Sequence, residues 1–454
     1  MNSGPLGRFM PCHNREQEEI TLKTNHLHST TSVFRLVMPI ALAVASVLLA
    51  LKLVAAQGTD NLIRVTTTSD SNRLSGWPSV NSNGTMVVFE SSGDFLEQGI
   101  PEGQDEIWLF ETAAMTLTRI TTASHSGRDS ERPSVNANGS VIAFHSFSDF
   151  LNQGIPAYQY EIWLYDTNTM TFTRITTATD SSRDSRNPSL SGDGTVVAFE
   201  SDSDFLGQGV PTFIPQIWLY DTKTMTFTCV TGGSDRRSED PSLSADGTVV
   251  AFQSASDFLN QGIPSGQIEI WLYDTKVMTF TRVTTASDSS RDSQLPSLSA
   301  DGTVIAFQSD SDFLNQGIPS GQIEIWLYDT KTMTFTRVTT ASSSDRTSST
   351  PSLNADGTVV SFNSQSDFLD EGIPSLQNEV WLYDTRTMTL TRVTVASESG
   401  RNSGGTSLSA DGTVVAFSSN SDFLDQGITA DLWEIWLKRV GYRIYLPLVL
   451  RQHQ

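Results

Sequence analysis

One sequence unit recurs seven times along this chain of 454 residues. An Ile-Trp-Leu or Val-Trp-Leu triplet marks each unit, and its spacing is 55 residues except for one interval of 53. The tryptophans are Trp108, Trp163, Trp218, Trp271, Trp326, Trp381 and Trp436. Units that repeat at a fixed period bury their apolar faces against their neighbours. Because a single hydrophobic core stops growing at roughly 250–300 residues, we expect a repeat array.

Each unit reads as four antiparallel strands. Residues 241–252 read Pro-Ser-Leu-Ser-Ala-Asp-Gly-Thr-Val-Val-Ala-Phe, with an Asp-Gly pair between two strand-like runs. This is the strongest short-range signal for a hairpin. A third strand is expected over 269–273 and a fourth over 278–284, joined by a short Asp-Thr-Lys turn. Seven such sheets arranged radially close into a β-propeller with few exposed edges, and a linear solenoid is the rival arrangement.

The two ends of the repeat region indicate how the ring closes. Residues 62–67, Leu-Ile-Arg-Val-Thr-Thr, copy the fourth-strand sequence of residues 281–285 but precede the first complete unit. We expect them to form the outer strand of the seventh blade. Residues 442–449 also read as a strand and compete for that place, but they lack the repeat signature. The predicted fold is therefore all-β, a seven-bladed propeller of four-stranded antiparallel blades closed by an N-terminal strand.

The repeated Pro-Ser-Leu-Ser-Ala-Asp-Gly-Thr-Val-Val-Ala-Phe and Ile-Trp-Leu-Tyr-Asp segments resemble the TolB-like, WD-repeat-like propeller unit, which reads Ser-Pro-Asp-Gly before a short apolar strand. The resemblance covers about residues 60–440 and implies the fold. Two departures stand out, because alanine most often replaces the proline before Asp-Gly and the loop after the second strand is long. The separate N-terminal domain of TolB is missing, so a Tol-Pal role is not implied. Similar propellers serve as binding platforms and as domains of serine peptidases, and fold alone does not choose between these roles.

The N-terminal segment has the pattern of an export signal. A largely apolar run over 36–51 follows Arg35 and precedes small residues, with a plausible cleavage point after Ala56. We divide the chain into a polar region with a signal peptide or anchor (1–57), the propeller (58–440) and a C-terminal tail (441–454). The expected location is periplasmic or extracellular. An uncleaved segment over 36–56 would instead anchor the protein, and this is the only membrane contact that we expect.

Charge and cysteine content exclude several functions. The chain carries 51 acidic and 29 Lys and Arg residues, a net charge of -22, which argues against nucleic acid as a partner because that needs a basic surface. Only Cys12 and Cys229 occur, so no disulfide is expected once the leader is removed. His125, His145 and His453 lack metal-ligand spacing, and no nucleophile elbow, phosphate loop or zinc motif is present. We expect no cofactor and no metal.

Loop lengths predict two unlike faces. The turns inside the hairpins are short, whereas the other two connections run to about a dozen residues and should share the opposite face, where binding residues usually lie. In those loops an arginine recurs in every unit, as does an aspartate before Phe-Leu. The arginines are Arg73, Arg128, Arg183, Arg236, Arg291, Arg346 and Arg401, and the aspartates are Asp94, Asp149, Asp204, Asp257, Asp312, Asp367 and Asp422. A ring of arginines could bind an anion, but sevenfold repetition favours a scaffold role. The Asp-x-Asp pairs at 202/204 and 310/312 are weak calcium candidates.

Function should appear where the units differ. Three positions at the mouth of the long-loop face vary: the residue before the Pro-Ser-Leu strand, the residue before that, and the residue ending the second strand. Their charged and aromatic members are our candidate ligand-binding residues, Trp77, Glu90, Glu131, Arg132, His145, Arg186, Glu200, Glu239 and Asp240. The competing interpretation is that these are solvated residues that vary freely.

Three functions fit this pattern. The first is an exported, non-enzymatic propeller, expected to be a monomer, that acts as a binding or scaffold module for a protein, peptide or glycan through its long-loop face. The second is a glycan-active enzyme that uses mouth carboxylates such as Glu90 and Glu200 with His145. The third is a purely structural cell-surface protein. No catalytic residue follows from the sequence alone.

Overall fold

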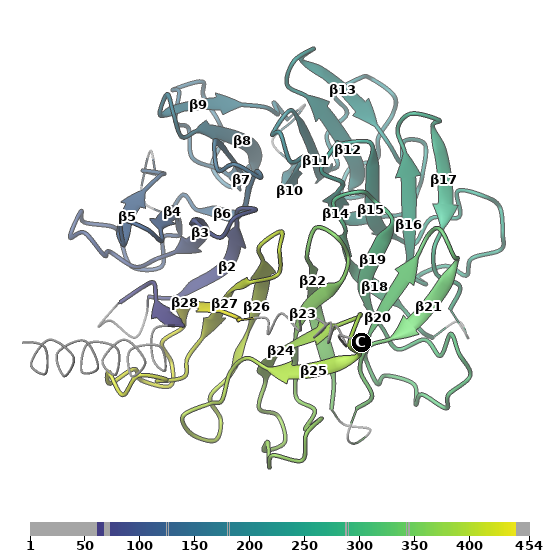
Figure 1. The fold of residues 1–454 in the computed structure, drawn as a ribbon. Helices are drawn as coiled ribbons and strands as arrows, with labels where there is room; N and C mark the ends of the chain where they lie inside the picture. The colour runs from purple at the N-terminus through teal and green to yellow at the C-terminus, as the bar shows by residue number, and fades with distance from the viewer. Residues whose placement is uncertain are drawn as a thin grey trace, which may run out of the picture. The chain divides into compact units, whose positions relative to one another are not determined.

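The computed structural model describes residues 61–67 and 73–441, apart from positions 124, 126, 179, 181, 287, 289, 342, 344 and 345. The described residues form seven four-stranded antiparallel sheets set radially around one axis, a seven-bladed β-propeller (Figure 1). The predicted fold class is confirmed, and the linear solenoid is excluded. The leader and the strand predicted over 442–449 lie outside the described residues.

The blades follow one another along the chain, and we call the strands of each blade a to d from the axis outward. Blade 1 contains β2 (Ser75–Val80), β3 (Met86–Ser91), β4 (Glu106–Glu111) and β5 (Thr116–Arg119). Blade 2 contains β6 (Ser130–Val135), β7 (Val141–Ser146), β8 (Glu161–Asp166) and β9 (Thr171–Arg174). Blade 3 contains β10 (Ser185–Leu190), β11 (Val196–Ser201), β12 (Gln216–Asp221) and β13 (Thr226–Cys229). Blades 4 and 5 contain β14 (Ser238–Leu243), β15 (Val249–Ser254), β16 (Glu269–Asp274), β17 (Thr279–Arg282); and β18 (Ser293–Leu298), β19 (Val304–Ser309), β20 (Glu324–Asp329), β21 (Thr334–Arg337). Blades 6 and 7 contain β22 (Ser348–Leu353), β23 (Val359–Ser364), β24 (Glu379–Asp384), β25 (Thr389–Arg392); and β26 (Ser403–Leu408), β27 (Val414–Ser419), β28 (Glu434–Arg439) with β1 (Leu62–Arg64).

The N-terminal strand closes the ring, as the repeat signature predicted. Strand β1 pairs antiparallel with β28, and Ile63 lies opposite Leu437. The Val65 N–H donates to the Ile435 carbonyl at 2.8 Å, which extends the pairing beyond the strand. First and last segments of the propeller are thereby joined in one sheet.

A buried ion pair joins strands c and d in six blades. In blade 5, Arg337 Nη2 lies 2.8 Å from Glu324 Oε1, and in blade 7 Arg64 of β1 makes the same contact with Glu434 at 2.8 Å. Blade 3 carries Gln216 and Cys229 at these two positions. Both partners change together there, as expected, since a buried charge that loses its partner is costly.

The hydrophobic core lies between neighbouring blades. All seven repeat tryptophans are fully buried. Between blades 4 and 5, for example, Ile270 packs in one cluster with Phe307 and Trp326. Trp326 also meets the b–c loop residue Phe313 edge to face, with ring centroids 5.0 Å apart. The tryptophan series is therefore inter-blade core, as expected from its repetition.

A closed ring of backbone hydrogen bonds ties the seven a–b turns together. The Ala300 N–H donates to the Ala355 carbonyl at 2.9 Å, and the equivalent bond runs from each turn to the next, ending with Ala410 N–H to Ser82 carbonyl at 2.9 Å. A proline has no N–H to donate. This bond explains why alanine, serine or glycine replaces the proline of the TolB-like unit. The same turn requires glycine at position 302, because the φ of Gly302 is +72° and a Cβ there would lie 3.1 Å from Val249.

Candidate functional site

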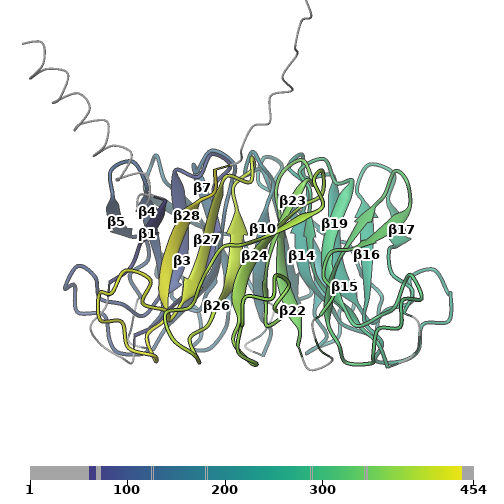
Figure 2. The same ribbon diagram turned by 60° about the horizontal axis from the view of Figure 1, so that its bottom comes forward.

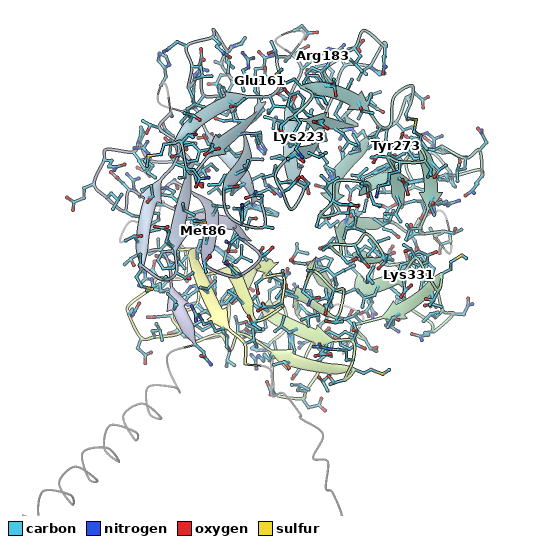
Figure 3. All side chains as sticks on the ribbon, turned by 45° about the horizontal axis from the view of Figure 1, so that its top comes forward. Met86, Glu161, Arg183, Lys223, Tyr273 and Lys331 are labelled. Carbon is cyan, nitrogen blue, oxygen red and sulfur yellow. The ribbon has the colours of Figure 1, made fainter. Side chains whose placement is uncertain are left out.

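Short and long connections lie on opposite faces, as predicted. In blade 5, Lys331 of the c–d turn reaches Asp301 of the a–b turn, with Nζ and Oδ2 3.3 Å apart, so both short turns share one face. The longer b–c and d–a connections gather at the other edge of the ring (Figure 2). Figure 3 shows the side chains on the ring, with Lys223 and Lys331 marking the c–d turns of blades 3 and 5.

The recurring arginines and aspartates hold the long loops in place. Arg236 donates from Nη1 to the carbonyls of Ala255 at 2.8 Å and Ile263 at 3.3 Å. Asp257 accepts hydrogen bonds from backbone N–H groups of its own loop, including that of Gly262 at 2.7 Å. Equivalent bonds recur around the ring, so these residues form a scaffold, and the anion-binding interpretation loses its support.

Asp202 and Asp204, which the sequence offered as calcium ligands, also hold the long loops in place. Asp202 accepts N–H bonds from Asp184 at 2.9 Å and Phe213 at 2.6 Å, and Asp204 accepts one from Gln208 at 2.7 Å. Within the part of the chain that the structure describes, no three His, Cys, Asp or Glu side chains are grouped to hold a metal ion.

The third residue of each a strand forms what we call the inner ring. Its members are Trp77, Arg132, Asn187, Asp240, Leu295, Thr350 and Gly405, and all have a positive φ between 47° and 59°. They line a cavity of about 260 Å³ on the propeller axis, the axial cavity. Three of the predicted residues, Trp77, Arg132 and Asp240, are thus brought together. The strand register shifts at this residue in every blade, which turns the inner ring toward the axis.

The last-but-one residue of each b strand, here called the clamp position, contacts the inner ring of the next blade. At five junctions its side chain accepts the backbone N–H of the inner-ring residue. These bonds are Glu90 to Arg132 at 2.7 Å, His145 to Asn187 at 3.2 Å, Glu200 to Asp240 at 2.9 Å, Gln253 to Leu295 at 3.0 Å and Gln308 to Thr350 at 3.2 Å. In blades 6 and 7 the shorter Asn363 and Ser418 bond within their own blades, to Ser349 and Gly404. The predicted residues Glu90, His145 and Glu200 therefore join neighbouring blades.

Three predicted residues, Glu131, Arg186 and Glu239, lie opposite the clamp positions of blades 2 to 4. Glu131 lies opposite His145, and its Oε2 is 3.1 Å from His145 Nε2. Burial lowers the pKa of His145, so its neutral ring donates to Glu131 and accepts from Asn187 through Nδ1. Arg186 stacks on Tyr160, with its guanidinium carbon 4.3 Å from the ring centroid. Glu239 lies 3.4 Å from Arg237.

A larger pocket, of about 510 Å³, opens where blades 6, 7 and 1 meet, and we call it the blade 1/7 pocket. Small residues make this space, because Gly405 and Ser418 stand where every other blade carries a larger side chain, and Gly76 and Gly404 are both glycines. Its charged and aromatic lining residues are Trp77, Glu90, Asp105 and Trp433, with Asn363 and Asn378 on the blade 6 side. Of the predicted residues, only Trp77 and Glu90 line it.

Asp105 and Trp433 escaped the sequence analysis. Both occupy the position just before the Glu-Ile-Trp-Leu motif, where the seven blades carry six different residue types. Its occupants are Asp105, Tyr160, Pro215, Ile268, Ile323, Asn378 and Trp433. Variation directly beside an almost constant motif was the signal that could have revealed them.

The blade 1/7 pocket contains two carboxylic acids that hold protons near neutral pH. Burial raises the pKa of Glu90 to about 8, despite the hydrogen bond from Arg132. Burial, followed by the charge of Asp129, raises the pKa of Asp105 to about 7. Glu90 lies opposite Gly76, and even a Cβ on that glycine would stay 3.8 Å from Oε1. One oxygen of Glu90 holds the inner ring, and the other lies beside Gly76.

Comparisons with known proteins establish the fold and no family. No family model matches the sequence, and no curated protein is significantly similar to it. The oligogalacturonate lyase from Vibrio parahaemolyticus shares 14% identity at a TM-score of 0.54, over 84% of this chain and 93% of that chain. A puromycin-hydrolysing peptidase from Mycobacterium tuberculosis shares 13% at 0.53, over 82% and 55%. TolB from Acinetobacter baumannii shares 18% at 0.41, over 74% and 76%.

These similarities contradict our expectation of a non-enzymatic binding or scaffold module. The similar propellers include a lyase and a peptidase, so the fold gives no preference for a non-enzymatic role. The described part of the chain contains no apolar helix of membrane-spanning length.

Proposed function

We propose that the blade 1/7 pocket binds an uncharged carbohydrate and hydrolyses a glycosidic bond by acid–base catalysis. The observation that carries this proposal is the meeting of Glu90 and Asp105, two acids with raised pKa values, in one pocket walled by Trp77 and Trp433. Enzymes that work near neutral pH obtain a proton donor and a proton acceptor from carboxyl groups by placing them in such environments.

The two acids have separate roles. Glu90 donates the proton on Oε1 to the glycosidic oxygen as the bond from that oxygen to the anomeric carbon breaks. Ionised Asp105 takes a proton from the water that attacks the anomeric carbon. Because Glu90 must be protonated and Asp105 ionised, the rate should be greatest between about pH 7 and pH 8.

The aromatic residues and the charge of the chain favour an uncharged sugar. Trp77 is 42% exposed and offers an aromatic face to the apolar side of a sugar ring. A net charge of -22 repels polyanions. The oligogalacturonate of the Vibrio enzyme is therefore a poor model for the substrate of this chain.

The finer expectations from the sequence belong to the same proposal. The chain is a divergent member of the TolB-like repeat proteins, exported by its leader and monomeric. Its repeat signature and the apolar run over 36–51 support this assignment.

The test uses the full chain and neutral cello-, xylo-, manno- and malto-oligosaccharides of two to six units, with galacturonate oligomers as the charged comparison. Release of reducing ends is measured. We expect cleavage of a neutral series and a loss of kcat of at least about 100-fold in Glu90→Gln, the usual contribution of a general acid.

A matched control separates catalysis from structure. Glu200→Gln changes the equivalent clamp position, which lies outside the blade 1/7 pocket. Glutamine already makes this bond at Gln253 and Gln308, so both variants should fold and Glu200→Gln should keep its activity. Equal loss in both variants, or cleavage of galacturonate oligomers alone, would contradict the proposal.

A further inference from the structure

The axial cavity and the blade 1/7 pocket lie next to each other. Trp77, Thr350 and Gly405 line both of them. Their volumes of about 260 and 510 Å³ together fall in the range of about 300–1,000 Å³ typical of ligand pockets. A ligand bound beside Glu90 can therefore extend over Trp77 onto the axis.

The inner ring keeps side chains in a conformation that costs energy. Gly405 adopts a positive φ without strain, and Asn187 and Asp240 tolerate it, whereas Trp77, Leu295 and Thr350 are bulky or β-branched residues at 47° to 52°. Such positions cost on the order of 1–3 kcal/mol each. Methionines of the c–d turns, such as Met278 and Met333, also have a positive φ in blade after blade. The inner ring differs from those turns because its residue changes in every blade.

The axial cavity has one polar and one apolar side. On blades 2 to 4, Asn187 Nδ2 lies 3.4 Å from Asp240 Oδ1, and Arg132 completes the polar arc. Leu295 faces them from blade 5. Between these side chains the wall is made by Pro78, Pro133, Pro188, Pro241, Pro296, Pro351 and Thr406. A sugar ring, with hydroxyl groups on its rim and an apolar face, matches this division.

Arg132 of blade 2 holds Trp77, which lines both the axial cavity and the blade 1/7 pocket. The Arg132 guanidinium carbon lies 3.2 Å from the centre of the Trp77 ring. The backbone N–H of the same arginine is held by Glu90. Glu90, which lies in the blade 1/7 pocket, thus holds Arg132 and through it the Trp77 ring.

We infer that the axial cavity is a second carbohydrate subsite, which binds the sugar units next to the bond cleaved beside Glu90. The inference rests on the proposed function, because it takes the same neutral oligosaccharide as its ligand. Arg132, Asn187 and Asp240 bind its hydroxyl groups, and Leu295 packs against its apolar face. Longer oligosaccharides should therefore be better substrates than a disaccharide.

The test fills the axial cavity with a larger side chain. Leu295→Trp places in blade 5 the residue that blade 1 already carries at this position, as Trp77. Leu376→Trp is the matched control, because Leu376 also has a positive φ, 64°, but is 73% exposed and lines neither cavity. Hydrolysis of the cello-, xylo-, manno- and malto-oligosaccharides of two to six units is measured as kcat/KM.

We expect kcat/KM of the wild type to rise at least tenfold along the series that it cleaves. Leu295→Trp should abolish this rise, whereas Leu376→Trp should behave as the wild type. Cleavage without length dependence, or with the same dependence in Leu295→Trp, would overturn the second subsite and leave the role of Glu90 standing. Absence of cleavage in every series would overturn both.

Discussion

The two ends of the propeller axis differ in whether their contacts repeat from blade to blade. At the short-turn end, seven a–b turns carry small residues and repeat one backbone hydrogen bond around the ring. At the long-loop end, the inner ring carries seven different residues, and the clamp position bonds to the next blade at five junctions only. The blade 1/7 pocket opens where the clamp side chains are short. Uniform contacts hold the ring closed, which leaves the other end free to differ from blade to blade.

The largest expected effect concerns the uniform end. Ala300→Pro removes the N–H that donates to Ala355. The loss of this hydrogen bond should dominate the effect. Ala300 and Ala355 are half-buried, where a backbone hydrogen bond contributes about 0.5–1.5 kcal/mol, and urea unfolding should show a loss of that size. Ala300→Ser keeps the N–H, as Ser82 does in blade 1, and should unfold like the wild type. If the proline variant is as stable as the serine variant, the repeated hydrogen bond does not stabilise the short-turn end.

The second prediction concerns pH, because the pKa values of two acids, one at each end, shift in opposite directions. The raised pKa of Glu90, about 8, means that its contribution to stability is present below pH 4.5 and is lost as pH rises through 8. At the other end, hydrogen bonds from Thr303 and Ser299 outweigh burial and lower the pKa of Asp301 to about 2. Its contribution is present above pH 3.8 and is lost as pH falls through 2.

Urea unfolding of two variants measures this difference. Relative to the wild type, Glu90→Gln should gain stability between pH 5 and pH 9, because it no longer has an acid to ionise. Asp301→Asn should be less stable than the wild type at pH 7 and approach it near pH 2. If the stability of the two variants changes with pH in the same way, the pKa values of Glu90 and Asp301 are not shifted in opposite directions.

The smallest expected effect concerns strain in the inner ring. Leu295→Gly relieves a positive φ of 51° and should raise the free energy of unfolding by up to about 1 kcal/mol. Gly405→Ala should lower it by about 1 kcal/mol, because its φ is +59° and the new Cβ would lie 3.2 Å from Ser418 Oγ. A clear loss of stability in Leu295→Gly would show that the side chain stabilises the ring by packing and that its positive φ costs less than the packing gains.

The sequence predicted most of the scaffold. Hairpin signals such as Asp246-Gly247 and the buried Ile-Trp-Leu strands are local, and seven copies leave few ways to combine them. Ring closure by residues 62–64 was also readable, because that segment carries the repeat signature. The site was only partly readable. Trp77 and Glu90 were recognised as variable residues, but nothing local separates Glu90 from Glu200, which occupies the same position in blade 3.

The sequence by itself therefore determined the number of blades, their strands and the positions at which they vary. Only the tertiary structure decided which variable residues meet. Glu90 and Trp433 lie at opposite ends of the chain and become neighbours through closure of the ring. The raised pKa of Glu90 comes from burial in the assembled ring. Strand patterns depend on residues a few positions apart, whereas such a pocket depends on contacts between whole blades.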